Sequence, residues 1–136
     1  MDVATAIKAR FSSRSFLDRD VDLTLLEKIF DVARYAPSGV NTQPWQVIVL
    51  KSKSLLKCVK EMQQSFDNGQ VGIEEYDYYP QEWFEPYLTR RRNCGLRRFA
   101  ALEITRQDKE KRQAAWRLNY EFFGAPVGLI FLRDKR

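Results

Sequence analysis

A chain of 136 residues, 44% of them hydrophobic and 13% aromatic, is long enough for one globular domain with a core. Its net charge is +5, and the absence of histidine excludes Ser-His and Cys-His nucleophilic mechanisms and most zinc sites. The two cysteines, Cys58 and Cys94, form no C-x-x-C motif, and no apolar run has the length of a secretory or membrane-spanning segment. We therefore expect a cytoplasmic protein without a metal site.

The first predicted element is a short amphipathic helix that begins after Asp2, a residue type that favours the N-cap, and presents Val3 and Ile7 on one side. The segment after it contains Arg10, Ser12 and Arg14. Arginine offers a planar fork of donors to a phosphate, and serine hydroxyls can complete the shell. These arginines alone more often mark a solvated helix end. A phosphate site is therefore a hypothesis that needs a second motif.

A tight polar turn, residues 36–45, lies between a predicted helix and a predicted strand. The helix spans Asp22 to Tyr35, by its apolar spacing, and the strand spans Gln46 to Lys51. Asn41 and Gln43 within the turn each offer a carboxamide, which donates and accepts at once, as the edge of a flavin ring requires. An ordinary helix exit has a similar composition. The flanking aromatics Phe16 and Trp45 are interpreted as core residues.

The rest of the chain is predicted to be mostly helical. The expected elements are a helix over Lys53 to Phe66 capped by Ser52, a long aromatic loop over Asp67 to Pro86, helices over Tyr87 to Leu102 and Asp108 to Phe122, and a strand over Val127 to Leu132. Residues 88–136 carry 13 basic and 5 acidic side chains. Such a field attracts nucleic acid or small anions equally well, but no nucleic-acid-binding fold is recognisable. A solvated or ligand-steering face is the favoured interpretation.

The two site motifs occur together as R-x-S-x-R-x-F and A-P-S-x-x-N-x-Q-P-W. With a helix of suitable length between them, the chain resembles the FMN-dependent nitroreductase family. Residues 87–132 are similar to the branch that contains nitroarene and nitrobenzoate reductases. The resemblance implies an α+β fold with three layers, helix, sheet and helix. It also implies a homodimer that takes hydride from NAD(P)H onto FMN and passes it to a nitroaromatic or similar acceptor, with no nucleic acid or membrane as partner.

The resemblance assigns roles residue by residue. It implies that Arg10, Ser12 and Arg14 hold the phosphate, ribityl chain and ring edge of FMN. It implies that the ring, partly of the flavin held by the other subunit, is lined by Pro37, Ser38, Asn41 and Gln43. Because the flavin carries the chemistry, no protein side chain is expected to be catalytic. Weaker candidates for substrate contact are Tyr78, Tyr79, Trp83 and Phe84, although a loop merely pinned by its aromatics is the more common case.

Residues 1–136 are predicted to form a single nitroreductase-like domain whose C-terminal part is missing. Two predicted strands make a marginal sheet, and the family continues beyond the second of them with an interface helix and further strands. The intact form is expected to be an FMN oxidoreductase. The alternative is a truncated, catalytically inactive remnant that acts, if at all, as an interaction domain. Retention of the cofactor separates these two hypotheses, and a steep loss of affinity with added salt would mark a third, a nucleic-acid-binding module.

Overall fold

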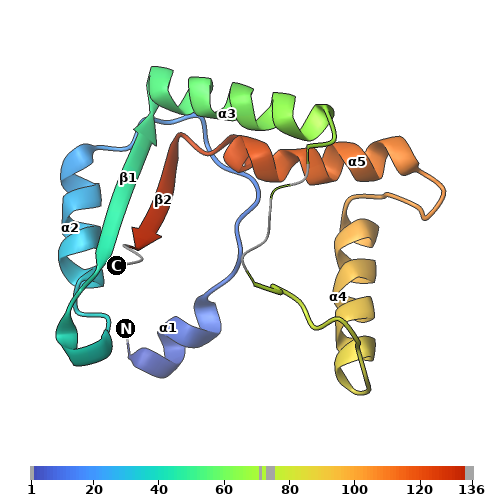
Figure 1. Ribbon diagram of the computed structural model, residues 1–136, viewed down its shortest axis with the longest axis horizontal. Helices are drawn as coiled ribbons and strands as arrows, with labels where there is room; N and C mark the ends of the chain where they lie inside the picture. The colour runs from blue at the N-terminus through green and yellow to red at the C-terminus, as the bar shows by residue number, and fades with distance from the viewer. Residues whose placement is uncertain (1, 71, 73–75, 134–136) are drawn as a thin grey trace. The chain divides into compact units, whose positions relative to one another are not determined.

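The computed structural model describes residues 2–70, 72 and 76–133, and every helix and strand expected from the sequence is present (Figure 1). In chain order the elements are α1 (Val3–Ala9), α2 (Leu23–Ala33), η1 (Gly39–Asn41), β1 (Trp45–Lys51), α3 (Ser52–Asp67), α4 (Tyr87–Ala101), α5 (Lys109–Arg117), η2 (Leu118–Gly124) and β2 (Val127–Arg133). Their contacts form two units. One comprises Met1–Glu61 with Glu121–Arg136, and the other comprises Met62–Tyr120. No described helix has both the length and the apolar character needed to cross a bilayer.

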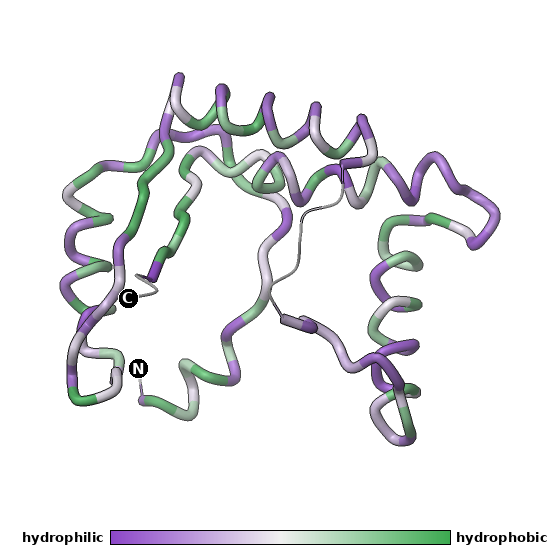
Figure 2. The backbone as a smooth tube through the Cα atoms, viewed as in Figure 1, coloured by the Kyte–Doolittle hydropathy of each residue, from purple (hydrophilic) through white to green (hydrophobic). Residues whose placement is uncertain are grey.

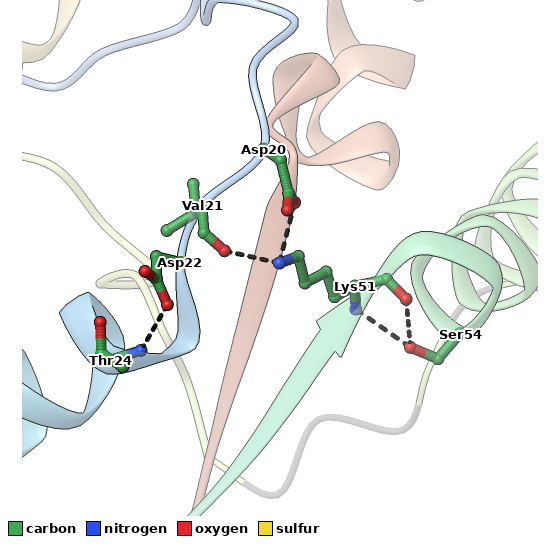
Figure 3. Close-up of polar contacts among 6 residues, drawn as sticks. All are labelled: Asp20, Val21, Asp22, Thr24, Lys51 and Ser54. Atoms are coloured by element: carbon green, nitrogen blue, oxygen red, sulfur yellow. Dashed lines mark hydrogen bonds and ion pairs between the residues drawn. The ribbon is translucent and has the colours of Figure 1, made fainter.

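Side-chain caps fix the starts of the first helices. Asp2 Oδ1 accepts from the backbone N–H of Thr5 at 2.9 Å, which confirms the predicted cap, and Asp22 Oδ1 accepts from Thr24 N–H at 2.9 Å. The prediction of a Ser52 cap is wrong. Ser52 is already the first residue of α3, and the hydroxyl at this helix start belongs to Ser54, which bonds both backbone groups of Lys51 (Figure 3).

The sheet of the first unit consists of β1 and β2, paired antiparallel from Trp45 opposite Arg133 to Lys51 opposite Val127 (Figure 1). Both strands are among the most hydrophobic stretches of the chain (Figure 2). Gly128 on β2 marks a close approach. A Cβ at this position would lie 2.9 Å from the Phe122 ring and 3.1 Å from Leu55 Cδ1, so only glycine lets α3 and η2 pack this closely on the strand.

Replacing Gly128 with alanine is therefore expected to lower the free energy of unfolding by about 1 to 3 kcal/mol, the usual cost of overpacking. Urea unfolding followed by circular dichroism measures this change. Gly95→Ala is the matched control, because nothing lies within 4 Å of a Cβ at that helical position and alanine is the better helix former. Equal destabilisation by both substitutions would show that the packing at Gly128 is not the cause.

The core is small. Among the described residues, the buried hydrophobic side chains are Leu26, Leu55 and Ala115. The interpretation of Phe16 and Trp45 as core aromatics is wrong, since each is 44% exposed. Phe16 lies in the irregular segment between α1 and α2, and Trp45 is the first residue of β1, at the margin of the sheet. At both positions nearly half of the side chain remains exposed.

The second unit contains the end of α3, together with α4 and α5. Arg117 of α5 pairs with Asp67 at the end of α3, its Nε 3.1 Å from Oδ1, and Arg98 Nη2 of α4 donates to the Ala115 carbonyl of α5 at 3.1 Å. These bonds tie the three helices of this unit to one another.

The helix predicted over Asp108 to Phe122 ends earlier, at Arg117. Residues Leu118–Gly124 continue as η2, in which Phe122 and Phe123 have φ of 51° and 55°. These left-handed angles are incompatible with a continuing α-helix. They belong to the turn that leads into β2.

Candidate functional site

The segment after α1 gathers the three residues predicted to hold a phosphate. Arg10 Nη1 donates to Ser12 Oγ at 3.5 Å, and Arg14 Nη1 donates to the Ser12 carbonyl at 3.2 Å. Within residues 2–70, 72 and 76–133, neither arginine forms an ion pair with a carboxylate. Most of their N–H donors are therefore available to an anion, which is the donor set that a phosphate group requires.

Phe123 is a neighbour of this group that the sequence did not reveal. The Arg14 guanidinium lies over its ring, 5.6 Å from the centroid, so η2 reaches the segment that follows α1. Phe122 and Phe123 both have left-handed φ angles, and strained backbone of this kind concentrates at functional sites. The sequence signal here is Phe-Phe-Gly-Ala-Pro, which by itself indicates only the end of a helix and the approach to a strand.

The same irregular segment is anchored at its far end by Lys51, the last residue of β1 (Figure 3). Lys51 Nζ lies 2.8 Å from Asp20 Oδ1 and also donates to the Val21 carbonyl. The hydrogen bond from Lys51 is the main cause that holds the pKa of Asp20 below its usual value of 3.8. The chain from Arg10 to Asp22 thus leaves α1 at one end and is fastened to the sheet at the other.

Acid is expected to weaken this anchor. Because the folded-state pKa of Asp20 is lowered, its contribution to stability is full above pH 3.8 and is lost as the pH falls through the lower folded-state value. Urea unfolding of the native chain and of Asp20→Asn should therefore differ at pH 6 and converge in strong acid. Asp18→Asn, at an exposed position without a side-chain hydrogen bond in the described part of the chain, is the control. A difference for Asp20→Asn that persists unchanged in strong acid would contradict the assignment.

The polar turn is held by its own side chains. Ser38 Oγ accepts from Gln43 N–H at 2.9 Å, and Gln43 Nε2 donates to Asn41 Oδ1 at 3.1 Å. This bond leaves Asn41 Nδ2 as a donor and Gln43 Oε1 as an acceptor, and neither has a partner among the described residues. Val40, Asn41 and Gln43 all have left-handed φ between 46° and 57°, a costly conformation for the β-branched Val40. The turn therefore presents a donor and an acceptor on a strained, well-defined backbone.

A hollow of about 340 Å³ lies at this turn. It is lined by Arg34, Tyr35, Ala36, Pro37, Asn41 and Gln43. Arg34 was not predicted; it pairs with Asp31 at 3.0 Å and brings a cation to the two carboxamides. Among the described residues, no hydrogen bond or ion pair joins this turn to Arg10, Ser12 or Arg14. The first unit thus carries two separate polar groups.

The aromatic candidates of the second unit contact one another. The ring centroids of Tyr78 and Tyr79 are 4.7 Å apart, those of Tyr79 and Trp83 are 6.0 Å apart, and Arg91 lies 4.7 Å from the Trp83 centroid. Phe84 packs edge-on against Tyr87. Residues 71 and 73–75 of the predicted loop lie outside the described residues. These contacts show how the aromatics hold the described part of the loop, and a role in substrate binding stays a prediction.

The chain is similar to known proteins over most of its length. A family model described as the nitroreductase family matches residues 7–136. The chain is 35% identical over 131 residues to a nitrobenzene nitroreductase of Ectopseudomonas oleovorans, covering 96% of this chain and 58% of that protein. It is 34% identical to a 4-nitrobenzoate reductase of Nocardioides sp. (strain LMS-CY), covering 91% and 51%. The chain thus spans little more than half the length of these relatives.

A solved structure is also similar to the chain, in both sequence and fold. The FMN and NADPH-dependent nitroreductase NfnB from Sphigopyxis sp. strain HMH matches with a TM-score of 0.87 and 38% identity, covering 99% of this chain and 61% of that one. The predicted α+β fold class is confirmed by this likeness and by the mixture of helices and strands.

Proposed function

Because the chain belongs to the nitroreductase family, we propose that it forms the FMN-binding part of an oxidoreductase that carries electrons from NAD(P)H to a nitroaromatic or similar acceptor. The observation that carries the proposal is the free donor set of Arg10 and Arg14 around Ser12. Relatives described as nitrobenzene nitroreductase and 4-nitrobenzoate reductase support the acceptor class. An FMN and NADPH-dependent structural neighbour supports the cofactor and the reductant.

The residues present fit FMN. Arg10, Ser12 and Arg14 would hold its phosphate, its ribityl chain and one edge of its ring through charge-assisted hydrogen bonds. The turn would meet the ring edge, with Asn41 Nδ2 donating to a ring carbonyl or nitrogen and Gln43 Oε1 accepting from a ring N–H. Pro37 would form part of the wall of the hollow, and Ser38 would hold the backbone of the turn by accepting from Gln43 N–H. The two polar groups share no bond, which is consistent with each serving a different flavin of a homodimer.

The protein's own contribution would be position and charge. Bound FMN supplies the hydride and electron chemistry, so no acid or base of the chain is required. The guanidiniums of Arg10 and Arg14 add positive charge, and a cation beside the ring favours its anionic reduced form. Tyr78, Tyr79, Trp83 and Phe84 stay candidates for contact with the acceptor, and a cytoplasmic location and a homodimer stay predictions.

The cofactor assignment is tested by releasing the flavin. We expect protein carrying this chain, extended to the length of its relatives, to yield FMN in the supernatant after heating, since no dinucleotide-binding glycine motif is present. Chromatography against FMN and FAD standards identifies the released flavin. FAD, or a flavin that stays with the denatured protein, would overturn the assignment. Extended protein that binds no flavin but retains a partner protein would favour the interaction-domain alternative.

A further inference from the structure

A concave site of about 860 Å³ lies wholly within the second unit. One wall is a face of α4, on which residues 88, 91, 92, 95 and 99 recur at helical spacing, and the other is formed by residues 104–106 and 112. The volume falls in the range of small-molecule sites, roughly 300 to 1,000 Å³. It contains none of the residues proposed to hold FMN.

Of the described residues, four arginines and no carboxylate line this site. Two of the guanidiniums are held in place: Arg91 lies 4.7 Å from the Trp83 centroid, and Arg112 lies 5.2 Å from the Phe99 centroid with its Nη1 donating to the Arg106 carbonyl. Cations fixed in advance lose less conformational entropy when a ligand binds. The arrangement therefore favours an anion.

The positive charge is not neutralised locally. In the part of the chain that the structure describes, the guanidiniums of Arg92 and Arg106 have no hydrogen bond or ion pair. Asp108 lies beside Thr105, whose hydroxyl and N–H donate to its Oδ2 at 2.6 and 2.8 Å and lower its pKa, so it stays charged; among the described residues it forms no ion pair with an arginine of this site. Helix α4 itself contains five arginines and no acidic residue. A ligand with a negative head would meet an unsatisfied set of donors.

The body of the site is apolar. Leu88, Leu96, Phe99 and Ile104 line it between the arginines. Gly95 lies in the middle of the helical wall, where the position that its Cβ would take is open space among the described residues. Apolar walls with a few convergent charged groups are typical of sites for small organic ligands. The apolar lining between the arginines favours a small organic ligand over a nucleic acid, whose backbone is recognised by charge alone.

We propose that this site binds an amphipathic organic anion, a small molecule with an apolar body and a carboxylate head. The apolar body fills the space beside Gly95. The carboxylate accepts hydrogen bonds from Arg92 and Arg106, which have donors to spare among the described residues, while Arg91 and Arg112, held over aromatic rings, add fixed positive charge. The proposal is independent of the proposed flavin chemistry, because binding here needs neither FMN nor NAD(P)H.

Equilibrium dialysis of the 136-residue chain with 2-naphthoate tests it, the bound concentration being measured by absorbance. We expect saturable binding of 2-naphthoate. The neutral isostere naphthalene-2-methanol should bind with an affinity at least about tenfold lower. Arg92→Gln should weaken 2-naphthoate about three- to tenfold. Arg97→Gln, the same change on the same helix but outside this site, should weaken it less than about twofold. Gly95→Leu should abolish binding by filling the site while favouring the helix.

Each other outcome overturns the proposal. Equal losses in Arg92→Gln and Arg97→Gln would show general attraction to a basic helix, and equal affinity for the neutral isostere would show an apolar patch only. Binding that survives Gly95→Leu would place the ligand elsewhere. Displacement of 2-naphthoate by a DNA duplex at lower concentrations would favour a nucleic-acid surface. Circular dichroism confirms that each variant is folded, and Arg92 and Gly95 are suited to substitution because neither is a packing residue.

Discussion

Replacing Arg14 with alanine is expected to weaken FMN binding by about 1.5 to 3 kcal/mol, roughly a 10- to 150-fold rise in Kd. The substitution removes a guanidinium with several unpaired N–H donors from the group around Ser12, and it also removes the cation that lies over Phe123. Quenching of FMN fluorescence measures the affinity. The chain should be extended for this experiment by the C-terminal part of a relative such as the nitrobenzene nitroreductase.

Arg19→Ala is the matched control, because it removes the same charge from the same irregular segment. Its backbone N–H donates to the Leu17 carbonyl, and its side chain forms no hydrogen bond or ion pair with the described residues. Arg14→Lys should give an intermediate loss, since an ammonium keeps the charge without the planar fork. If Arg14→Ala and Arg19→Ala retained FMN equally well, the phosphate role of Arg14 would have to be abandoned.

The second large effect concerns the 136-residue chain by itself, which is expected to unfold with a free energy below about 3 kcal/mol and to self-associate. Native proteins ordinarily unfold with a free energy of about 5 to 15 kcal/mol. Here the buried hydrophobic side chains among the described residues are Leu26, Leu55 and Ala115. The described sheet has two strands, so each strand leaves one edge open to pairing with another chain. Weak FMN binding would add little stability.

Urea unfolding and sedimentation velocity at several concentrations measure both effects. Phe131→Lys, at a β2 position that is 61% exposed, should reduce the association because a lysine on an open sheet disfavours pairing. Leu56→Lys is the control: it makes a comparable change at a 69% exposed position on α3, outside the sheet, and should reduce the self-association less. A monomer that melts cooperatively, is yellow as isolated and reduces a nitroarene with NAD(P)H would show that the chain is sufficient by itself.

The sequence predicted the elements well because the signals that define them are local. Asp2 precedes the apolar spacing of α1, and the strand at residues 46–51 is a β-branched run between polar residues. The predictions were wrong where tertiary contacts determine the end of a helix or the burial of a side chain. The helix expected to reach Phe122 stops at Arg117, because η2 must turn into β2 with two phenylalanines in left-handed conformations. Phe16 and Trp45 are half-exposed, which their hydrophobicity does not indicate.

The candidate site shows the same division. Arginine chemistry and the carboxamides of the turn, together with the two motifs, pointed to the family and to the residues that would hold FMN. Only the structure shows that Arg14 lies over Phe123. Only the structure shows that Lys51 holds the segment between α1 and α2 to the end of β1. Lys51 and Val21 are 30 positions apart in the sequence, and the paired residues of β1 and β2 are further apart still, so no local pattern encodes these contacts.

The sequence by itself thus determined the family, the α+β class, the order of helices and strands and the residue types available to an anionic cofactor, because each of these depends on local periodicity, capping and motif spacing. The tertiary structure decided which donors remain unpaired, such as Asn41 Nδ2, and where the arginines of α4 meet an apolar hollow beside Gly95. These features depend on side chains that distant segments bring together, and the free energy of packing, rather than any local preference, selects their partners.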